Sequence, residues 1–267
     1  GRHTRSDRDW SSDVCSSDLV EMLGPDEVRQ LIPAIGPDMA GGALATQSGH
    51  VTSPLALSRL LAAQIEAAGG VFVRAKATGF TIAADGPSHV RTDQGDFAVE
   101  DVVIAAGAFS KPLAAALGDR VPLDTERGYH MMLPRPRIEV RVPMLISSLG
   151  FGVTPMSDGL RLAGTVEFGG LKAPPNYARA DILLAHAKRL FPGLGDEGAK
   201  PWMGHRPSMP DSLPVISRSS RFERVFHAFG HGHLGLSLGA VTGRMIADLV
   251  QDRPSDIDAT PFRADRF

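Results

Sequence analysis

The stretch Phe226–Val250, FHAFGHGHLGLSLGAVTGRMIADLV, decides the fold. It begins inside an apolar run, Val225–Phe229, which has the length of a buried strand. The glycine-rich loop Gly230–Gly235 follows, and then a helix whose apolar positions recur at helical spacing: Leu236, Ala240, Met245 and Leu249. Together the three form a receptor for an anion or a dipole, because glycines let a ligand approach the free amide groups of the helix's first turn.

Composition excludes several classes of protein. Hydrophobic residues make up 43% of the 267 residues and charged residues 22%, which is typical of an α/β protein. The net charge is −2 and no long basic run occurs, so nucleic acid is not expected as a partner. No uninterrupted apolar run reaches about 18 residues, so the sequence predicts no transmembrane segment.

The first 19 residues differ from the rest. GRHTRSDRDWSSDVCSSDL is rich in Ser, Asp and Arg and has neither helical nor strand periodicity. It is similar to translated library-junction sequence, and we interpret it as non-native. It contains the only cysteine, Cys15, so the remaining body is predicted to lack disulfides, thiol catalysis and zinc–thiolate sites.

Local patterns predict a mixture of helices and strands. One helix is expected after Pro25, a second from Pro54 to Gly69 with Ser53 as N-cap, and a third over Ala178–Leu190. Residues 71–73 are predicted to form a parallel strand. Further strands are predicted over 77–84, 89–93, 96–99, 101–108, 144–148, 151–155, 160–167 and 225–229.

Several motifs of the sequence resemble those of a known protein family. The Gly230–Gly235 loop and its helix resemble the last strand–loop–helix of the D-amino-acid oxidase family of flavoproteins, above all its bacterial D-amino-acid dehydrogenase branch. Other stretches resemble family elements from about Val20 onward: Gly49–Pro54, Arg127–Tyr129, Gly164–Phe168 and Trp202–Asp211. The resemblance implies a mixed α/β fold, with a partial FAD-binding Rossmann-like domain and an inserted antiparallel-sheet substrate domain.

The same resemblance suggests how the chain divides. Residues 20–120 are expected to form part of the FAD-binding domain, 121–200 the substrate domain, 201–253 a return to the first domain and 254–267 a tail. The G-x-G-x-x-G fingerprint of a dinucleotide fold is absent, since Gly36–Gly42 has the wrong spacing and follows no predicted strand. We therefore expect a C-terminal portion of a longer enzyme, poorly soluble or partly unfolded in isolation.

The family's FAD contacts can be carried over to two places. Ala106 and Gly107 end a buried strand where family members pass close to the FAD diphosphate and ribityl groups, although a plain strand and turn is the alternative. The second place is the glycine loop before the last helix, where the candidates are Gly230, His231, Gly232, His233, Leu234 and Gly235. There the helix dipole would face the flavin.

One arginine is the leading candidate for substrate binding. The resemblance assigns Arg206 to the substrate carboxylate, and its planar fork can donate two parallel hydrogen bonds. The implied reaction transfers a hydride from Cα of an amino acid, most consistent with a D-amino acid, to flavin N5, and the imino acid hydrolyses to a 2-oxo acid. Tyr129, His130 and His233 would shape the pocket or hydrogen-bond to the amine or the flavin, with packing roles as the alternative.

Other functions are weaker predictions. A glycine- or sarcosine-type amine oxidase shares the carboxylate-binding arginine, while a flavin-free subunit or an unrelated binding module would not use it. His227, His231 and His233 suggest a metal, but the Gly230–Gly235 loop contains no Cys, Asp or Glu that would complete a ligand set, so no metal is predicted. A serine hydrolase lacks its G-x-S-x-G motif. The family implies oxygen or a quinone as electron acceptor and a cytoplasmic location, with contact to the inner membrane left open.

Overall fold

The computed structural model describes residues 19–267, which form two compact units. Unit 1 contains residues 19–53 together with 129–165 and 176–202, and unit 2 contains 54–128, 166–175 and 203–267. The strands β7 (Asp124–Leu133) and β11 (Lys200–Ser208) each belong in part to both units. The predicted junction stretch lies outside the described residues except for Leu19.

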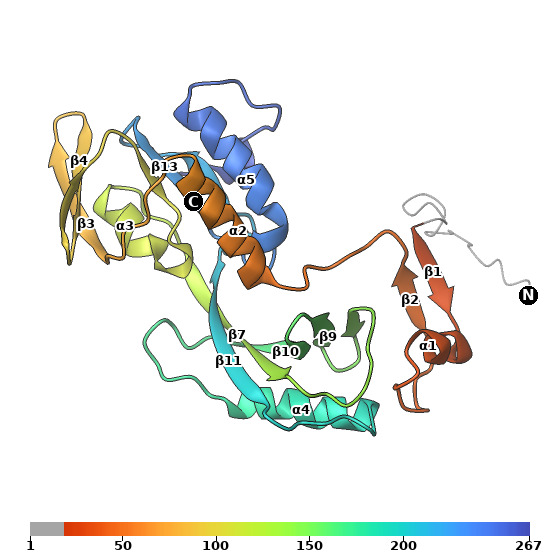
Figure 1. The fold of residues 1–267 in the computed structure, drawn as a ribbon. Helices are drawn as coiled ribbons and strands as arrows, with labels where there is room; N and C mark the ends of the chain where they lie inside the picture. Colours follow the sequence, from red (N-terminus) through yellow and green to blue (C-terminus); the bar gives the residue numbers. More distant parts are fainter. Residues whose placement is uncertain (1–18) are drawn as a thin grey trace, which may run out of the picture. The chain divides into compact units, whose positions relative to one another are not determined.

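Unit 1 is built on an antiparallel sheet and a helix. The sheet has the order β11-β7-β10-β9-β8 (Figure 1). On it packs α4, which begins and ends at the predicted residues and buries Leu183 and Ala187 against Phe151 and Leu162. The bounds of these elements are Met144–Ile146 for β8, Phe151–Met156 for β9, Gly159–Glu167 for β10 and Ala178–Leu190 for α4.

A hairpin and a short helix form the remainder of unit 1. The helix α1 (Pro25–Leu31) follows Pro25 as predicted, whereas the antiparallel strands β1 (Val20–Leu23) and β2 (Gly42–Ala45) were not predicted. His50 Nε2 lies 2.9 Å from the Pro155 carbonyl oxygen.

Unit 2 is centred on a three-stranded sheet of order β12-β13-β6. The strand β13 (Val225–Phe229) is parallel to β6 (Val102–Ile104) and antiparallel to β12 (Val215–Arg218). Alternate side chains of β13 enter different cores: Phe226 packs with α5 (Gly235–Val250), while Phe229 packs in the core that contains Leu117, after α3 (Ser110–Ala116). The sheet is therefore covered by apolar side chains on both faces.

The predicted three-stranded meander is confirmed. β3 (Ala77–Ala83), β4 (Gly86–Thr92) and β5 (Gly95–Ala98) are antiparallel neighbours. Gly86 and Gly95 have φ of +140° and +115°, a region that favours glycine, and lie at the predicted turns. Two short 3₁₀ turns, η1 (Gly107–Phe109) and η2 (Thr260–Phe262), complete the unit.

One predicted strand is wrong. Residues 71–73 are not a strand, and Val71 is 83% exposed. No strand among the described residues pairs with this run, and an extended segment without a ladder partner is not a β-strand. The helix before it, α2 (Pro54–Ala67), forms as predicted but buries none of its residues. Its apolar side chains Leu60, Leu61 and Ile65 are all more than half exposed.

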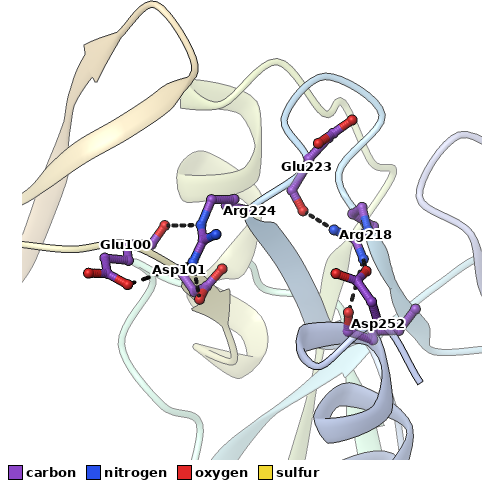
Figure 2. A network of polar contacts seen from close by, with 7 residues as sticks. Glu100, Asp101, Arg218, Glu223, Arg224 and Asp252 are labelled. Carbon is purple, nitrogen blue, oxygen red and sulfur yellow. Dashed lines mark hydrogen bonds and ion pairs between the residues drawn. The ribbon is translucent and has the colours of Figure 1, made fainter.

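Two arginines, Arg218 and Arg224, join the strands of the sheet in unit 2 to neighbouring segments (Figure 2). Arg224 donates to the Glu100 carbonyl oxygen at 3.1 Å and to Asp101 at 2.9 Å, which joins the start of β13 to the residues before β6. Arg218, on β12, contacts Asp252 and donates to the Leu249 carbonyl oxygen at 2.9 Å. The contacts of Arg218 fix the C-terminal end of α5 against the sheet.

Candidate functional site

Two motifs that the sequence analysis singled out separately meet in unit 2. The amide of Gly232 donates to the Pro207 carbonyl oxygen at 2.8 Å, and Ser208 and His231 form an antiparallel β-bridge. The end of β11, which carries Arg206, is therefore joined to the glycine loop before α5. Residues about 25 positions apart contribute to one site.

A pocket of about 200 Å³ lies at this junction. The loop adopts backbone conformations that favour glycine, with φ of +86° at Gly230 and +53° at Gly232. A Cβ at Gly230 would also lie 2.8 Å from the Met209 side chain. The residues lining the pocket are Glu126, Ser208, Met209, Ser212, Gly230, His231, Gly232, His233 and Leu234. Since α5 begins at Gly235, its first-turn amides adjoin this pocket.

The two histidines of the loop differ in environment. His231 Nε2 lies 2.9 Å from Thr242 Oγ1 on α5, and burial lowers the pKa of His231. Its ring is therefore neutral at neutral pH and is held against the helix. His233 is exposed and lines the pocket. Both lie where the prediction placed them, beside the start of α5.

Arg206 lies on β11 in a half-buried position beside β7. Its guanidinium occupies the space that a side chain at Gly128 would fill, because a Cβ there would be 2.3 Å from Nη2. Burial lowers the pKa of Arg206, and the negative charge of Glu126 opposes that shift. A guanidinium remains charged even so, and a charge taken partly out of water interacts strongly with an anion.

Four residues that line the pocket were not predicted as site residues: Glu126, Ser208, Met209 and Ser212. Ser208 Oγ is buried and has no hydrogen-bond partner among residues 19–267, and Glu126 lines the same pocket. Ser208 is two residues after Arg206, so both occupy the same face of β11. Recognising Lys200–Ser208 as a strand would have identified Ser208. We find no sequence signal for Glu126 beyond its place beside the Arg127–Tyr129 motif.

The neighbouring arginine of that motif has a structural role. Arg127 is fully buried and donates to three carbonyl oxygens, at 2.7 Å to Gly170, 2.6 Å to Ala173 and 3.1 Å to Pro174. Its guanidinium is thereby committed to holding the loop 166–175. A free carboxylate would have to displace these bonds in order to bind it.

Tyr129 and His130 lie in unit 1. The Tyr129 hydroxyl accepts a hydrogen bond from the Asn176 amide at 3.0 Å, and the side chain is buried. The His130 ring stacks on Trp202 with 4.8 Å between centroids. Burial, assisted by the charge of Arg161, lowers the pKa of His130 to about 4, so this ring is neutral at neutral pH. Their predicted substrate contacts stay predictions.

The other predicted cofactor contact, Ala106 and Gly107, follows β6. Gly107 has φ of +55° and follows Ala106 at the start of η1. A Cβ on Gly107 would meet no atom within 4 Å, so the backbone there is open to an approaching molecule.

The described part of the chain has neither a candidate metal cluster nor a candidate membrane-spanning helix. Residues 19–267 contain no cluster of three or more His, Cys, Asp or Glu side chains arranged to hold a metal ion. None of the helices in that range has the length and apolar character needed to cross a bilayer.

Comparisons with known proteins agree with the motifs. The family model described as FAD dependent oxidoreductase matches residues 5–249. A D-amino-acid oxidase from Bradyrhizobium diazoefficiens is 41% identical over 249 residues, and a D-amino acid dehydrogenase from Paramagnetospirillum magneticum is 35% identical over 258 residues. These matches cover 92% and 91% of this chain, and the chain spans 59% of each relative's length.

Solved structures show the same fold. A glycine oxidase from Geobacillus kaustophilus superposes with a TM-score of 0.81 at 27% identity, covering 93% of this chain and 67% of that one. An L-proline dehydrogenase from P. horikoshii superposes with a TM-score of 0.79 at 18% identity, covering 93% and 68%. The expected mixed α/β fold with its antiparallel sheet is thus confirmed, and the chain belongs to the FAD dependent oxidoreductase family.

Proposed function

We propose that this protein oxidises a D-amino acid with FAD, giving an imino acid that water converts to a 2-oxo acid and ammonia. The observation that carries this proposal is the junction of Arg206's strand with the glycine loop around one pocket. The names of the 41% and 35% identical relatives support an amino acid of D configuration. The 27% identical glycine oxidase makes glycine the second candidate substrate.

The residues present fit FAD on two observations. The Gly107 backbone is open to an approaching molecule, and Ser208 Oγ is a buried hydroxyl that lacks a partner within residues 19–267. In this proposal Ala106, Gly107 and the Gly230–Gly235 loop hold the cofactor, with the first-turn amides of α5 stabilising negative charge. Bound FAD supplies the acceptor for the hydride that leaves Cα.

The chain's own side chains bind and orient the substrate. Arg206 donates two hydrogen bonds to the carboxylate, which fixes the direction of the Cα–H bond. His231 stays uncharged because burial lowers its pKa, so it adds no positive charge that would compete with Arg206 for the carboxylate. His233 is exposed at the pocket and is the candidate for contacts with the remainder of the ligand.

The test is the visible spectrum of the purified chain after incubation with excess FAD. We expect a retained flavin band that bleaches under nitrogen when D-alanine is added, more slowly with glycine and not with L-alanine. A Gly107→Val variant should retain less FAD, because the added side chain occupies the open backbone position at a φ that valine avoids.

Three results would contradict the proposal. Absence of a flavin band would show that this chain does not hold FAD. A band that no amino acid bleaches would reject the substrate class, and faster bleaching by glycine than by D-alanine would favour the second candidate.

A further inference from the structure

One charged side chain of the pocket has no role in the proposed function. Glu126 lies on β7, is half-buried and lines the pocket together with Gly230–Leu234. Its carboxylate forms no hydrogen bond or ion pair within residues 19–267, although it lies near enough to Arg206 to affect that residue's charge. A carboxylate that lines a pocket without a donor from the chain is open to a donor from a ligand, so its place there points to a cationic group.

Glu126 and Arg206 are presented by the same surface. Gly128 is two residues from Glu126, so both positions face the same side of β7. The Arg206 guanidinium lies over Gly128, where a Cβ would come within 2.3 Å to 2.7 Å of its atoms. A negative side chain that lines the pocket and a positive side chain on the neighbouring strand therefore lie close enough for their charges to interact.

An α-amino acid carries the complementary pair of charges. Its carboxylate and its ammonium group are attached to the same carbon, so a neighbouring arginine and glutamate can bind both at once. Charge-assisted hydrogen bonds are stronger than neutral ones, and a group left without its partner loses binding. A 2-hydroxy acid of the same shape offers only the carboxylate and a neutral hydroxyl, so the two ligand classes separate the contributions of the two side chains.

We infer that the Glu126 carboxylate binds the charged amino group of the substrate while Arg206 binds its carboxylate, so that the site selects α-amino acids over 2-hydroxy acids. This inference rests on the proposed function. Glu126 acts as a specificity residue that contacts the substrate. Because Glu126 on β7 and Arg206 on β11 are close together, they suit a ligand whose amino and carboxylate groups are attached to the same carbon.

The experiment measures binding rather than turnover. Calorimetric titrations of D-alanine and D-lactate are made with the chain whose FAD has been reduced beforehand under nitrogen, so that no oxidation occurs. We expect the chain to prefer D-alanine. Glu126→Gln should weaken D-alanine binding by about 10-fold or more and leave D-lactate binding unchanged. The matched control is Glu66→Gln, on exposed α2, which should change neither affinity.

Each other outcome overturns the inference. If Glu126→Gln keeps the preference for D-alanine, Glu126 does not bind the amine. If the variant loses both ligands equally while its circular dichroism is unchanged, Glu126 is only a counter-ion of Arg206. If the parent chain binds neither ligand, the proposed function itself fails. This outcome differs from failure of the inference alone, in which the parent chain binds D-alanine and Arg206→Gln removes that binding.

Discussion

At the scale of single residues, the site depends on a glycine that makes room for an arginine. Gly128 leaves the space that the Arg206 guanidinium fills, and any side chain there would lie within 2.3 Å of Nη2. Arg206 has a flexible stem, so it would move away from an added methyl group rather than unfold the strand. The position of the guanidinium, and not only its presence, should determine carboxylate binding.

Gly128→Ala tests this dependence. Displacing the guanidinium should weaken binding of both D-alanine and D-lactate by about 10-fold, the effect of losing one charge-assisted hydrogen bond. Gly239→Ala is the control, since a Cβ there meets no atom within 4 Å on α5 and should leave binding unchanged. Unchanged titrations for Gly128→Ala would show that Arg206 does not bind the carboxylate from this position.

His130 makes the stability of unit 1 depend on pH. Burial lowers its pKa from 6.5 to about 4, so the unfolded chain binds a proton that the folded unit refuses between those values. The stabilisation is complete above about pH 6.5 and is lost progressively as the pH falls towards 4. Urea unfolding from pH 7.5 to 4 should show this loss, and His130→Gln should flatten it. An equally steep profile in the variant would assign the pH dependence to other groups.

Predictability differed sharply among the site residues. Arg206 and the Gly230–Gly235 loop were identified from their motifs, and the structure brings them together. Ser208 and Glu126 were not, because no strand was predicted over Lys200–Ser208 or Asp124–Leu133. Which residues share a face of a strand can be derived only once the strand itself is recognised.

At the scale of secondary-structure elements, a buried polar network ties the end of α3 to β12 and β13. Asp119 is 4% exposed and accepts hydrogen bonds from His227 Nε2 at 2.8 Å, from the Ser220 amide at 3.0 Å and from the hydroxyl groups of Ser219 and Ser220. Burial raises the pKa of Asp119, but these donors outweigh it and hold the pKa well below its usual range. The carboxylate thus stays ionised inside unit 2.

Removing this carboxylate should destabilise the unit. Asp119→Ala leaves His227 and two serines without their acceptor and should lower the free energy of unfolding by about 3 kcal/mol, as expected for one partner of a buried pair. Asp101→Ala breaks the exposed contact to Arg224 drawn in Figure 2 and should cost less than about 1 kcal/mol. Urea titrations compare the two variants, and similar losses for both would show that the network contributes no more than a surface ion pair.

Elements were predicted well where one pattern dominates. The helix α4 and the strand β13 have the predicted bounds, because amphipathic spacing and a short apolar run bounded by polar residues are unambiguous. The run at 71–73 has the same strand character but no partner within residues 19–267, so composition alone misled. Pairing depends on the tertiary context, which a local pattern does not contain.

At the scale of the whole molecule, the described chain exposes an unusual amount of apolar surface. α2 buries none of its residues, and Leu60 and Leu61 are 59% and 56% exposed. Val71 and Phe72 add further exposed apolar area after the helix. Exposed apolar side chains promote association, since covering them removes apolar surface from water.

We therefore expect the chain to self-associate in a concentration-dependent way. The double variant Leu60→Gln with Leu61→Lys should shift sedimentation towards the monomer without reducing helical circular dichroism, because both side chains are exposed. Leu145→Gln, at an exposed position on β8, is the matched control and should leave association unchanged. A chain that remains monomeric at all concentrations before substitution would contradict this expectation.

We propose that Arg206 orients an amino acid for oxidation beside the glycine loop before α5. The most direct measurement is the rate of anaerobic flavin bleaching by D-alanine in the FAD-loaded chain and in Arg206→Lys, with Arg244→Lys on α5 as control. We predict at least about 10-fold slower bleaching at low D-alanine for Arg206→Lys, because lysine cannot form the two parallel bonds. Equal bleaching rates for all three proteins would show that Arg206 does not orient the amino acid.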